Sequence, residues 1–333
     1  MTGERVVHVV VPEGIDDSTL PSGGNVYDRR LCEELVLSGW LVVEHTSLDR
    51  VPEGAVALVD GLVAVAGPDG VEREAGRLRV VVLLHMPFGE RDAGTVAAEA
   101  RVLAAATAVV TTSAWSRHWV RDRYAPACPV HVAEPGVDAA DAAPGPGSGE
   151  RLLCVAAVTR EKGHHLLLSA LAELLDQSWS LTCAGSLARD RSHAESVQRF
   201  ATDVGVAERL TWTGALDRDE LDKAYAAADL TVLASRAESW GMVVTESLAR
   251  GVPVVATSVG GVPEAMGSTP LGVPGLLVTP GDRGALAAAL REWLTDPALR
   301  EQLREAALAR RTTLAGWSDT AAKVAQVLTE VSS

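Results

Sequence analysis

The sequence predicts an α/β protein of two domains, each built on a parallel sheet covered by helices. Short apolar runs rich in Val, Leu and Ala alternate with longer segments of helical periodicity, which is the pattern of doubly wound sheets. The length of 333 residues suits two domains of ordinary size. A stretch rich in Ala, Pro, Gly and Ser, residues 139–150, interrupts the pattern as a linker would. We therefore predict a domain boundary near residues 140–149.

Composition restricts the partners and the compartment. The formal net charge of −14 argues against a protein that binds nucleic acid or anionic lipid. The four cysteines form no CxxC pair, so we expect free thiols in a reducing compartment and neither disulfides nor a zinc site. No signal-peptide pattern precedes the first strand, and no apolar run has the length of a membrane span. We expect a cytoplasmic protein without an integral membrane segment. The sequence gives no indication of the oligomeric state.

The first predicted strand leads into a glycine pair. Residues 6–11 form the strand, and the following loop ends at Gly23 and Gly24, before a helix that runs to about residue 38. A strand, two glycines and a helix start can bind phosphate, because the backbone N–H groups there have no helical partners. Such a pair also occurs in ordinary turns. No GxGxxG fingerprint follows the strand, which argues against NAD or FAD.

A histidine follows another buried strand of the first half. His85 comes directly after the apolar residues 80–84, so it lies at the sheet edge where parallel strands bind ligands. The alternative is a structural histidine that is hydrogen-bonded within its loop. The other strands predicted in this half are residues 41–44, 55–59 and 108–111, with helical segments between them.

Positive charge marks the first turn of the second half. A strand at residues 152–158 is followed by Arg160, Lys162 and Gly163, and then by a helix over 164–175. Cations at a strand–helix turn can neutralise an anionic ligand, which a protein of net negative charge needs. Solvated surface charges are the alternative. Further along, strands are predicted at 181–185 and 209–214 and a helix at 221–228.

Two carboxylates follow the next buried strand, residues 230–234. Glu238 falls in the loop and Glu246 in a helix predicted over 242–250, which Gly251 would end. Each carboxylate can accept hydrogen bonds from a pair of sugar hydroxyls, and the N–H groups at the helix start suit phosphate oxygens. This combination fits a nucleotide-activated sugar, although both glutamates could also be ordinary solvated charges.

The sequence predicts no metal site. Asp217 and Asp219 have the spacing of a metal-binding DxD pair, but they lie directly before the predicted helix at 221–228, where carboxylates favour helix starts. His164 and His165 have no partners at ligand spacing and are expected to pack or be solvated at their helix start.

The stretch from residue 225 to 264 resembles the retaining glycosyltransferases of family 4, which have the GT-B architecture. The resemblance is carried by the spacing E-x7-E from Glu238 to Glu246 and by the strings YAAAD at 225–229, ARGVP at 249–253 and GGVPE at 260–264. It extends more loosely over the whole chain. It implies two facing Rossmann-like domains with a cleft between them. It also implies a hexosyltransferase that moves a sugar from a nucleoside diphosphate sugar with retention at the anomeric carbon.

The resemblance implies roles for individual residues. His85 would lie near the reacting sugar carbon, Glu238 would hold a hydroxyl of the donor sugar, and Lys162 would stabilise the departing diphosphate. Ala157 stands where the family has the arginine of its R-x4-K-G element, so that charge would come from another residue, Arg160 or Arg236. The catalytic set is thus His85, Glu238 and Lys162, and the donor-binding set is Gly23, Gly24, Arg160, Lys162, Arg236, Glu238, Ser239, Trp240, Gly241, Met242, Val243 and Glu246. No cofactor is expected beyond the donor substrate.

The resemblance divides the chain into an acceptor side and a donor side. Residues 1–143 would form the acceptor-side domain and 144–317 the donor-binding domain, with a terminal helix at about 318–333 packed back on the first. Two loops, at 16–22 and 87–95, would meet an unidentified small-molecule acceptor. Two alternative functions are a nucleotide-sugar epimerase of the same architecture and a non-catalytic nucleotide-sugar-binding protein.

Overall fold

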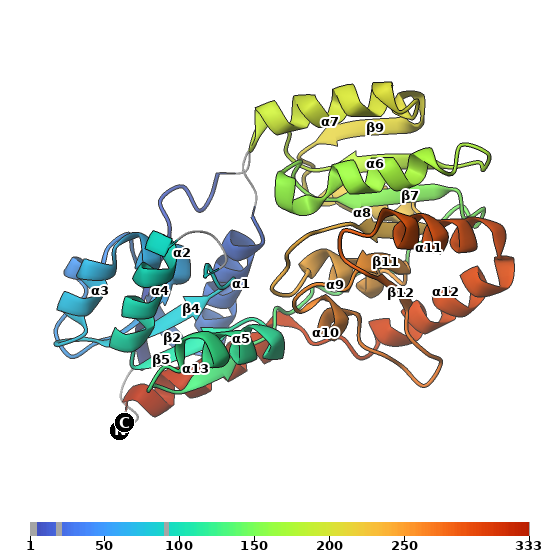
Figure 1. The fold of residues 1–333 in the computed structure, drawn as a ribbon. Coiled ribbons are helices and arrows are strands. Elements are labelled where there is room, and N and C mark those ends of the chain that lie inside the picture. Colours follow the sequence, from blue (N-terminus) through green and yellow to red (C-terminus); the bar gives the residue numbers. More distant parts are fainter. Residues whose placement is uncertain (1–4, 18–21, 90–92, 333) are drawn as a thin grey trace. The chain divides into compact units, whose positions relative to one another are not determined.

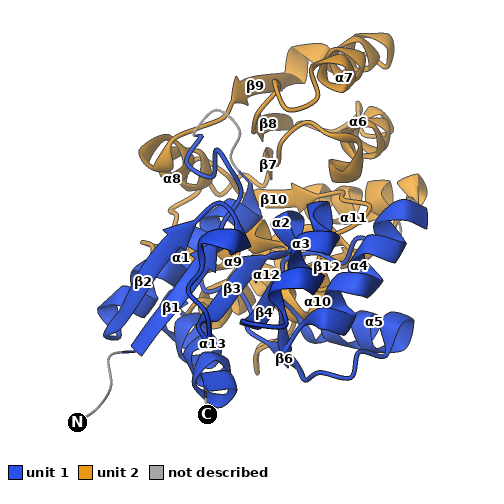
Figure 2. Cartoon of the chain, turned by 90° about the vertical axis from the view of Figure 1, so that its left-hand side faces the viewer, with its two compact units in different colours: residues 1–17, 22–136, 315–333 blue, residues 18–21, 137–314 orange. Residues whose placement is uncertain are grey.

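The structure, a computed structural model, describes residues 5–17, 22–89 and 93–332 (Figure 1). Within these residues the strands form two six-stranded sheets, and all pairings between the named strands are parallel. Each sheet is the centre of one compact unit (Figure 2). Unit 1 comprises the described residues 5–17, 22–89, 93–136 and 315–332, and unit 2 comprises the described residues 137–314. The predicted α/β class with two Rossmann-like domains is therefore confirmed.

Unit 1 is built on a sheet of strand order β2-β1-β3-β4-β5-β6. Apart from the exposed Arg79 at the start of β4, the strands β3, β4 and β5 are buried and almost wholly apolar, because a parallel sheet is covered on both faces. The strand order changes direction between β1 and β3, and open α/β sheets bind ligands beyond the carboxyl ends of strands at such a switch point. The strands are β1 (Arg5–Val10), β2 (Trp40–His45), β3 (Val56–Asp60), β4 (Arg79–Leu84), β5 (Ala108–Thr111) and β6 (Val130–Val132).

The helices of unit 1 include one from the far end of the sequence. Helix α1 begins at Gly23 because Ser22 caps it, accepting a hydrogen bond of 3.1 Å from the N–H of Asn25. Helix α13 packs against α1 and buries Trp317 and Val324. The helices are α1 (Gly23–Leu37), α2 (Gly61–Ala66), α3 (Pro68–Glu74), α4 (Ala93–Ala105), α5 (Ala114–Tyr124) and α13 (Trp317–Ser332), with a short 3₁₀ helix at Leu48–Arg50.

Unit 2 is built on a sheet of order β12-β11-β10-β7-β8-β9. Counted from its first strand, this is the 3-2-1-4-5-6 order of dinucleotide-binding folds, with the switch point between β7 and β10. Every residue of β10 and of β11 is buried, which explains why apolar residues predominate in both strands. The strands are β7 (Arg151–Val155), β8 (Ser180–Ala184), β9 (Leu210–Gly214), β10 (Leu230–Leu233), β11 (Val254–Thr257) and β12 (Gly275–Val278).

Glycines and capping carboxylates set the helix ends of unit 2. Gly241, at φ +89°, precedes α9, and Gly251, at φ +67°, follows it, so the predicted end of this helix is confirmed. Asp217 caps α8 by accepting the N–H of Glu220, as expected for a carboxylate at a helix start. The helices are α6 (His164–Ala172), α7 (Arg191–Asp203), α8 (Arg218–Ala226), α9 (Met242–Ala249), α10 (Val262–Met266), α11 (Arg283–Thr295) and α12 (Pro297–Arg311), with 3₁₀ turns at Arg160–Lys162 and Ala207–Arg209.

The chain passes from unit 1 to unit 2 earlier in the sequence than the linker composition suggested. The units divide after Gly136, whereas the sequence prediction placed the boundary at residue 143. The residues in between are tied to unit 2 by backbone groups: the N–H of Ala143 donates to the carbonyl of Arg250, and Arg304 and Arg311 donate to carbonyls of the segment. A stretch of linker composition is therefore fixed by tertiary hydrogen bonds.

The other differences between the predicted and the observed elements are small. Strand β6 and helix α7 were not predicted, and the connection between β2 and β3 carries only a 3₁₀ turn where a helix was expected. Helix α6 ends at Ala172, three residues before the predicted end. None of the described helices is both long and apolar enough to span a bilayer.

Candidate functional site

Lys162 and Glu238 form an ion pair at the switch point of the unit 2 sheet. Lys162 follows β7 and Glu238 follows β10, the two adjacent strands where the order changes direction. Lys162 Nζ donates to Glu238 Oε1 at 2.6 Å, and Ser235 Oγ donates to the same oxygen at 2.8 Å. The Lys162 side chain is 31% exposed and that of Glu238 12% exposed, so the pair lies at the surface without being fully solvated. Two of the three residues predicted to be catalytic are thus in direct contact.

The start of helix α9 offers free donors beside this pair. Within the described chain, the N–H groups of Gly241, Met242 and Val243 have no hydrogen-bond acceptor, and the first internal bond is from Val244 to the carbonyl of Gly241. The positive end of the helix dipole adds to their attraction for an anion. The binding of phosphate oxygens by these groups stays a prediction, with which their geometry is compatible.

Two further cationic side chains, Arg160 and Arg236, lie near the turn after β7. Arg160 and Arg236 are exposed, and neither guanidinium has an ion-pair partner among the residues that the structure describes. The backbone ties the two loops together, since the N–H of Arg236 donates to the carbonyl of Glu161 at 2.7 Å. Burial lowers the pKa of His165, and the charges of His193, Arg236 and Arg160 lower it further. Either arginine therefore lies where it could supply the charge that Ala157 lacks.

Glu246 is a half-buried residue of α9 that contacts the neighbouring helix α8. Its Oε2 accepts a hydrogen bond of 3.3 Å from the hydroxyl of Tyr225, a fully buried residue of α8. Burial raises the pKa of the Glu246 carboxyl, while the charge of Arg250 and the Tyr225 hydrogen bond oppose that shift. Arg250 in turn stacks over the Tyr225 ring at 4.6 Å and pairs with Asp222. A carboxylate fixed in this way is prearranged to accept hydrogen bonds from a ligand.

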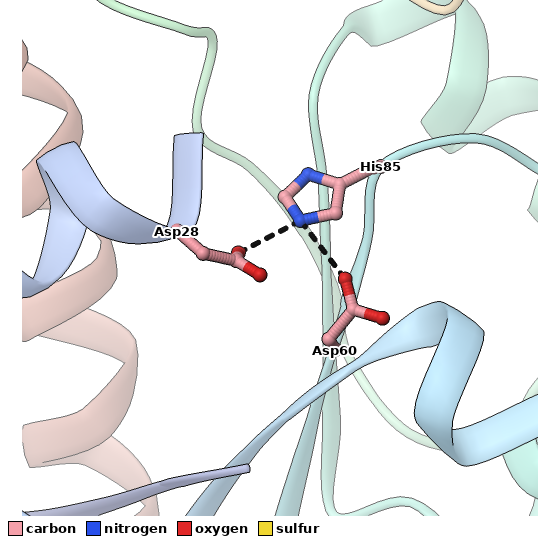
Figure 3. Close-up of side chains that lie close together, drawn as sticks. All are labelled: Asp28, Asp60 and His85. Atoms are coloured by element: carbon pink, nitrogen blue, oxygen red, sulfur yellow. Dashed lines mark hydrogen bonds and ion pairs between the residues drawn. The ribbon is translucent and has the colours of Figure 1, made fainter. Parts of the chain in front are cut away.

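In unit 1, His85 lies between two carboxylates (Figure 3). It follows β4, as predicted, and its Nε2 lies 2.8 Å from Asp28 Oδ1 and 3.2 Å from Asp60 Oδ2. Burial opposes the charged form of His85, but the charges and hydrogen bonds of Asp28 and Asp60 outweigh it and raise the pKa of the ring to about 10. Gly24 is close to the ring as well, because a Cβ on Gly24 would lie 3.2 Å from His85 Cδ2.

The remaining predicted site residues lie in different surroundings. Trp240 is buried in a core cluster with Val244 and Leu248, so its indole packs in the core beneath the loop that carries Glu238. Ser239 is half-buried in the same loop. Gly23, Gly24 and His85 belong to unit 1, whereas all the other predicted residues belong to unit 2. Of the two loops expected to meet the acceptor, residues 18–21 and 90–92 lie outside the described residues.

Sequence reasoning missed several partners of the predicted residues. Asp60 had a signal, since it directly follows the apolar run of β3 and therefore lies at the same sheet edge as His85. Asp28 and Tyr225 had none, because their contacts with His85 and Glu246 depend on packing between elements distant in the sequence. One group of side chains in the described part of the chain is close enough to share a metal ion. It consists of Asp28, Asp60 and His85, whose possible ligand atoms all lie within 4.8 Å of one another.

Comparison with known proteins identifies a family to which the chain is similar. The family profile described as glycosyl transferases group 1 matches residues 141–310. D-inositol 3-phosphate glycosyltransferase 1 of Catenulispora acidiphila is 32% identical over 250 residues, covering 69% of this chain and 59% of the relative. A GDP-mannose-dependent alpha-(1-6)-phosphatidylinositol monomannoside mannosyltransferase of Mycolicibacterium smegmatis is 28% identical over 323 residues, covering 83% of this chain and 79% of the relative. The chain spans 59% and 60% of the length of two D-inositol 3-phosphate glycosyltransferases that it matches.

A solved structure shares the fold of the chain. Sucrose-phosphate synthase of Thermosynechococcus elongatus superposes with a TM-score of 0.82 at 20% sequence identity, covering 98% of this chain and 99% of that structure. Likeness at this identity shows a common fold and carries no statement about substrates.

Proposed function

Since this chain belongs to the glycosyl transferases group 1 family and has the GT-B fold, we propose that it is a retaining glycosyltransferase of family 4. The donor is a nucleoside diphosphate sugar and the acceptor a small molecule, and the reaction takes place in the cytoplasm. The observation that carries the proposal is the Lys162–Glu238 pair beside the free N–H groups of α9, at the switch point of the sheet. The GDP-mannose dependence in the name of the M. smegmatis relative supports an activated-sugar donor.

Different residues of unit 2 bind the diphosphate, the sugar and the ribose of the donor. Lys162 and the N–H groups at the start of α9 stabilise negative charge on the departing diphosphate, a preorganised electrostatic role. Glu238 holds a hydroxyl of the sugar, and Glu246 holds the ribose. The bond between the anomeric carbon and the diphosphate oxygen breaks as the bond to the acceptor oxygen forms on the same face of the sugar, and the departing diphosphate takes the proton of the acceptor hydroxyl. This gives retention without a covalent intermediate.

Incubation with labelled donor tests this proposal against its two alternatives. The donor is found first by thermal shift across uridine and guanosine diphosphate sugars, since a ligand that binds only the native state raises the midpoint of unfolding. Labelled donor is then incubated with candidate acceptors, beginning with D-inositol 3-phosphate because relatives carry that name. Label transferred to the acceptor with its anomeric configuration kept supports the proposal. An isomerised donor would indicate an epimerase, and saturable binding without turnover would indicate a binding protein.

The proposed transfer does not depend on a divalent metal ion. Lys162 and the start of α9 supply the positive charge that a metal provides in other transferases. We therefore expect undiminished turnover in excess EDTA, measured with the donor that the screen identifies. Complete loss of turnover that magnesium or manganese restores would contradict this part of the proposal.

A further inference from the structure

Asp28 is a buried carboxylate that accepts a hydrogen bond from His85. It lies on α1, one turn after Gly24, and is 2% exposed. Its second oxygen, Oδ2, has no hydrogen-bond partner within the described residues. Burying a charge in this way is costly unless a partner compensates for it. The neighbouring Arg29 forms ion pairs with Asp16 and Glu44 on the exposed side, so His85 is the cation in direct contact with Asp28.

Asp60, at the end of β3, contacts the same nitrogen of His85 as Asp28 does. We call these two carboxylates the clamp on His85. Oδ1 of Asp60 caps α2 by accepting the N–H groups of Leu62 and Val63, which fixes the carboxylate, and its Oδ2 faces His85 Nε2. The two carboxylates therefore approach one ring nitrogen from α1 and from the end of β3. These elements flank the switch point of the unit 1 sheet, where a ligand is expected.

Other contacts fix the orientation of the imidazole. The ring of Tyr27 packs edge-on against it with 5.0 Å between centroids, and Gly24 leaves only the room that the ring needs. The hydroxyl of Thr112 donates to the backbone carbonyl of His85 at 3.1 Å. In Figure 3 the second ring nitrogen, Nδ1, lies on the side away from both carboxylates. Within the described ranges no hydrogen bond reaches Nδ1.

We propose that Asp28, together with Asp60, is a positioning residue that fixes His85 as an imidazolium and presents its Nδ1–H to an oxygen of the bound substrate. An imidazolium donates from both nitrogens and accepts at neither, so His85 binds a hydroxyl or phosphate oxygen and does not act as a general base. This assignment rests on the proposed glycosyl transfer for the identity of the substrate. The state of the ring itself is independent of that function.

The charges that face the ring are consistent with this state. They are the carboxylates of Asp28 and Asp60, with Arg29 acting on Asp28 and the Tyr27 hydroxyl donating to the carbonyl of Ala133. Burial raises the pKa of Tyr27 well above its usual value, so that hydroxyl stays neutral. Burial also raises the pKa of Asp28, against the opposing pull of His85. Two carboxylates around one N–H group favour the protonated ring.

NMR titration of histidine-labelled protein tests the state of the ring without any substrate. The His85 signal is assigned by its loss in His85→Gln. We expect wild-type His85 to remain protonated at neutral pH, and its pKa to fall by at least about one unit in Asp28→Asn and in Asp60→Asn, as removal of a close opposite charge predicts. Glu74→Gln is the matched control, because Glu74 is a buried acid of unit 1 that pairs with Arg73 and Arg77. A neutral His85 at pH 7, or a pKa unchanged in both variants, would overturn the proposal.

Turnover and metal content complete the test. Asp28→Asn should lower kcat about ten- to a hundred-fold with a much smaller change in the donor KM, since lost orientation slows the reaction more than binding. Glu74→Gln should leave both constants unchanged. Full turnover in Asp28→Asn would overturn the proposal, as would a stoichiometric divalent ion bound to wild type and lost in Asp28→Asn, because the carboxylates would then be metal ligands. If no donor is turned over by wild type while the titration behaves as expected, the proposed transfer fails and the state of the ring stands.

Discussion

At the scale of single residues, Lys162 and Glu238 form an ion pair, and in the proposed donor complex a diphosphate would compete with Glu238 for the lysine. Glu238→Ala removes this competitor, so it should leave the affinity for bare nucleoside diphosphate unchanged or tighter while turnover falls by roughly a hundredfold. Lys162→Ala should weaken the bare nucleotide by about 1.5–3 kcal/mol, the range of a charge-assisted hydrogen bond. Titration calorimetry with the sugar-free nucleotide, beside turnover of each variant, separates the two roles. Equal losses of nucleotide affinity in both variants would place Glu238 on the phosphates.

Glu246 is expected to act on the nucleoside part of the donor. Glu246→Gln should weaken binding of the free nucleoside diphosphate by about 1.5–3 kcal/mol, because the neutral amide is a poorer acceptor for ribose hydroxyls than the carboxylate. Tyr225→Phe is the control, since it removes the 3.3 Å hydrogen bond but keeps the charge of Glu246. The control should lose less affinity. A dissociation constant unchanged in Glu246→Gln would exclude the residue from the site.

At the scale of elements, Gly163 allows the turn after β7 to pack against the end of β10. It has φ +68°, and a Cβ there would lie 1.9 Å from the carbonyl oxygen of Ala234. Gly163→Ala should therefore cost roughly 3 kcal/mol or more of the free energy of unfolding, from backbone strain plus the clash. Gly205→Ala is the matched control, because Gly205 has φ +77° and open space around it. The control should lose only about 1 kcal/mol in urea denaturation. Similar losses in both variants would show that the close approach is unimportant.

The sequence predicted elements well where the signal is local. The apolar run at β10, the start of α9 and the glycine that ends it follow from neighbours along the chain, and so do the positions of Glu238 and Lys162 at strand ends. Strand β6 lacked such a signal because it has only three residues with His131 in the middle. The pairing of Lys162 with Glu238 and the clamp on His85 are tertiary. No local pattern encodes which carboxylate faces which cation.

At the scale of the whole molecule, the clamp on His85 predicts how stability depends on pH. The pKa of His85 is raised from 6.5 to about 10 on folding, so its contribution is fully present below pH 6.5 and is lost as the pH rises through about 10. We expect the difference in the free energy of unfolding between wild type and His85→Gln to shrink by roughly 1–2 kcal/mol from about pH 8 to about pH 9.5. Urea denaturation at both pH values measures it. A difference independent of pH would mean that the ring is neutral.

The return of α13 to unit 1 sets an order for folding during synthesis. Residues 137–314 of unit 2 are continuous, whereas unit 1 needs α13, where Trp317 packs on Tyr27 and Thr320 donates to the carbonyl of Glu134. On the ribosome the strands of unit 1 emerge first, yet their last helix is translated only after all of unit 2. The apolar surface of unit 1 that α13 covers therefore stays exposed while unit 2 is synthesised. Because Tyr27 also touches His85, the surroundings of that histidine are completed only after unit 2 has been translated.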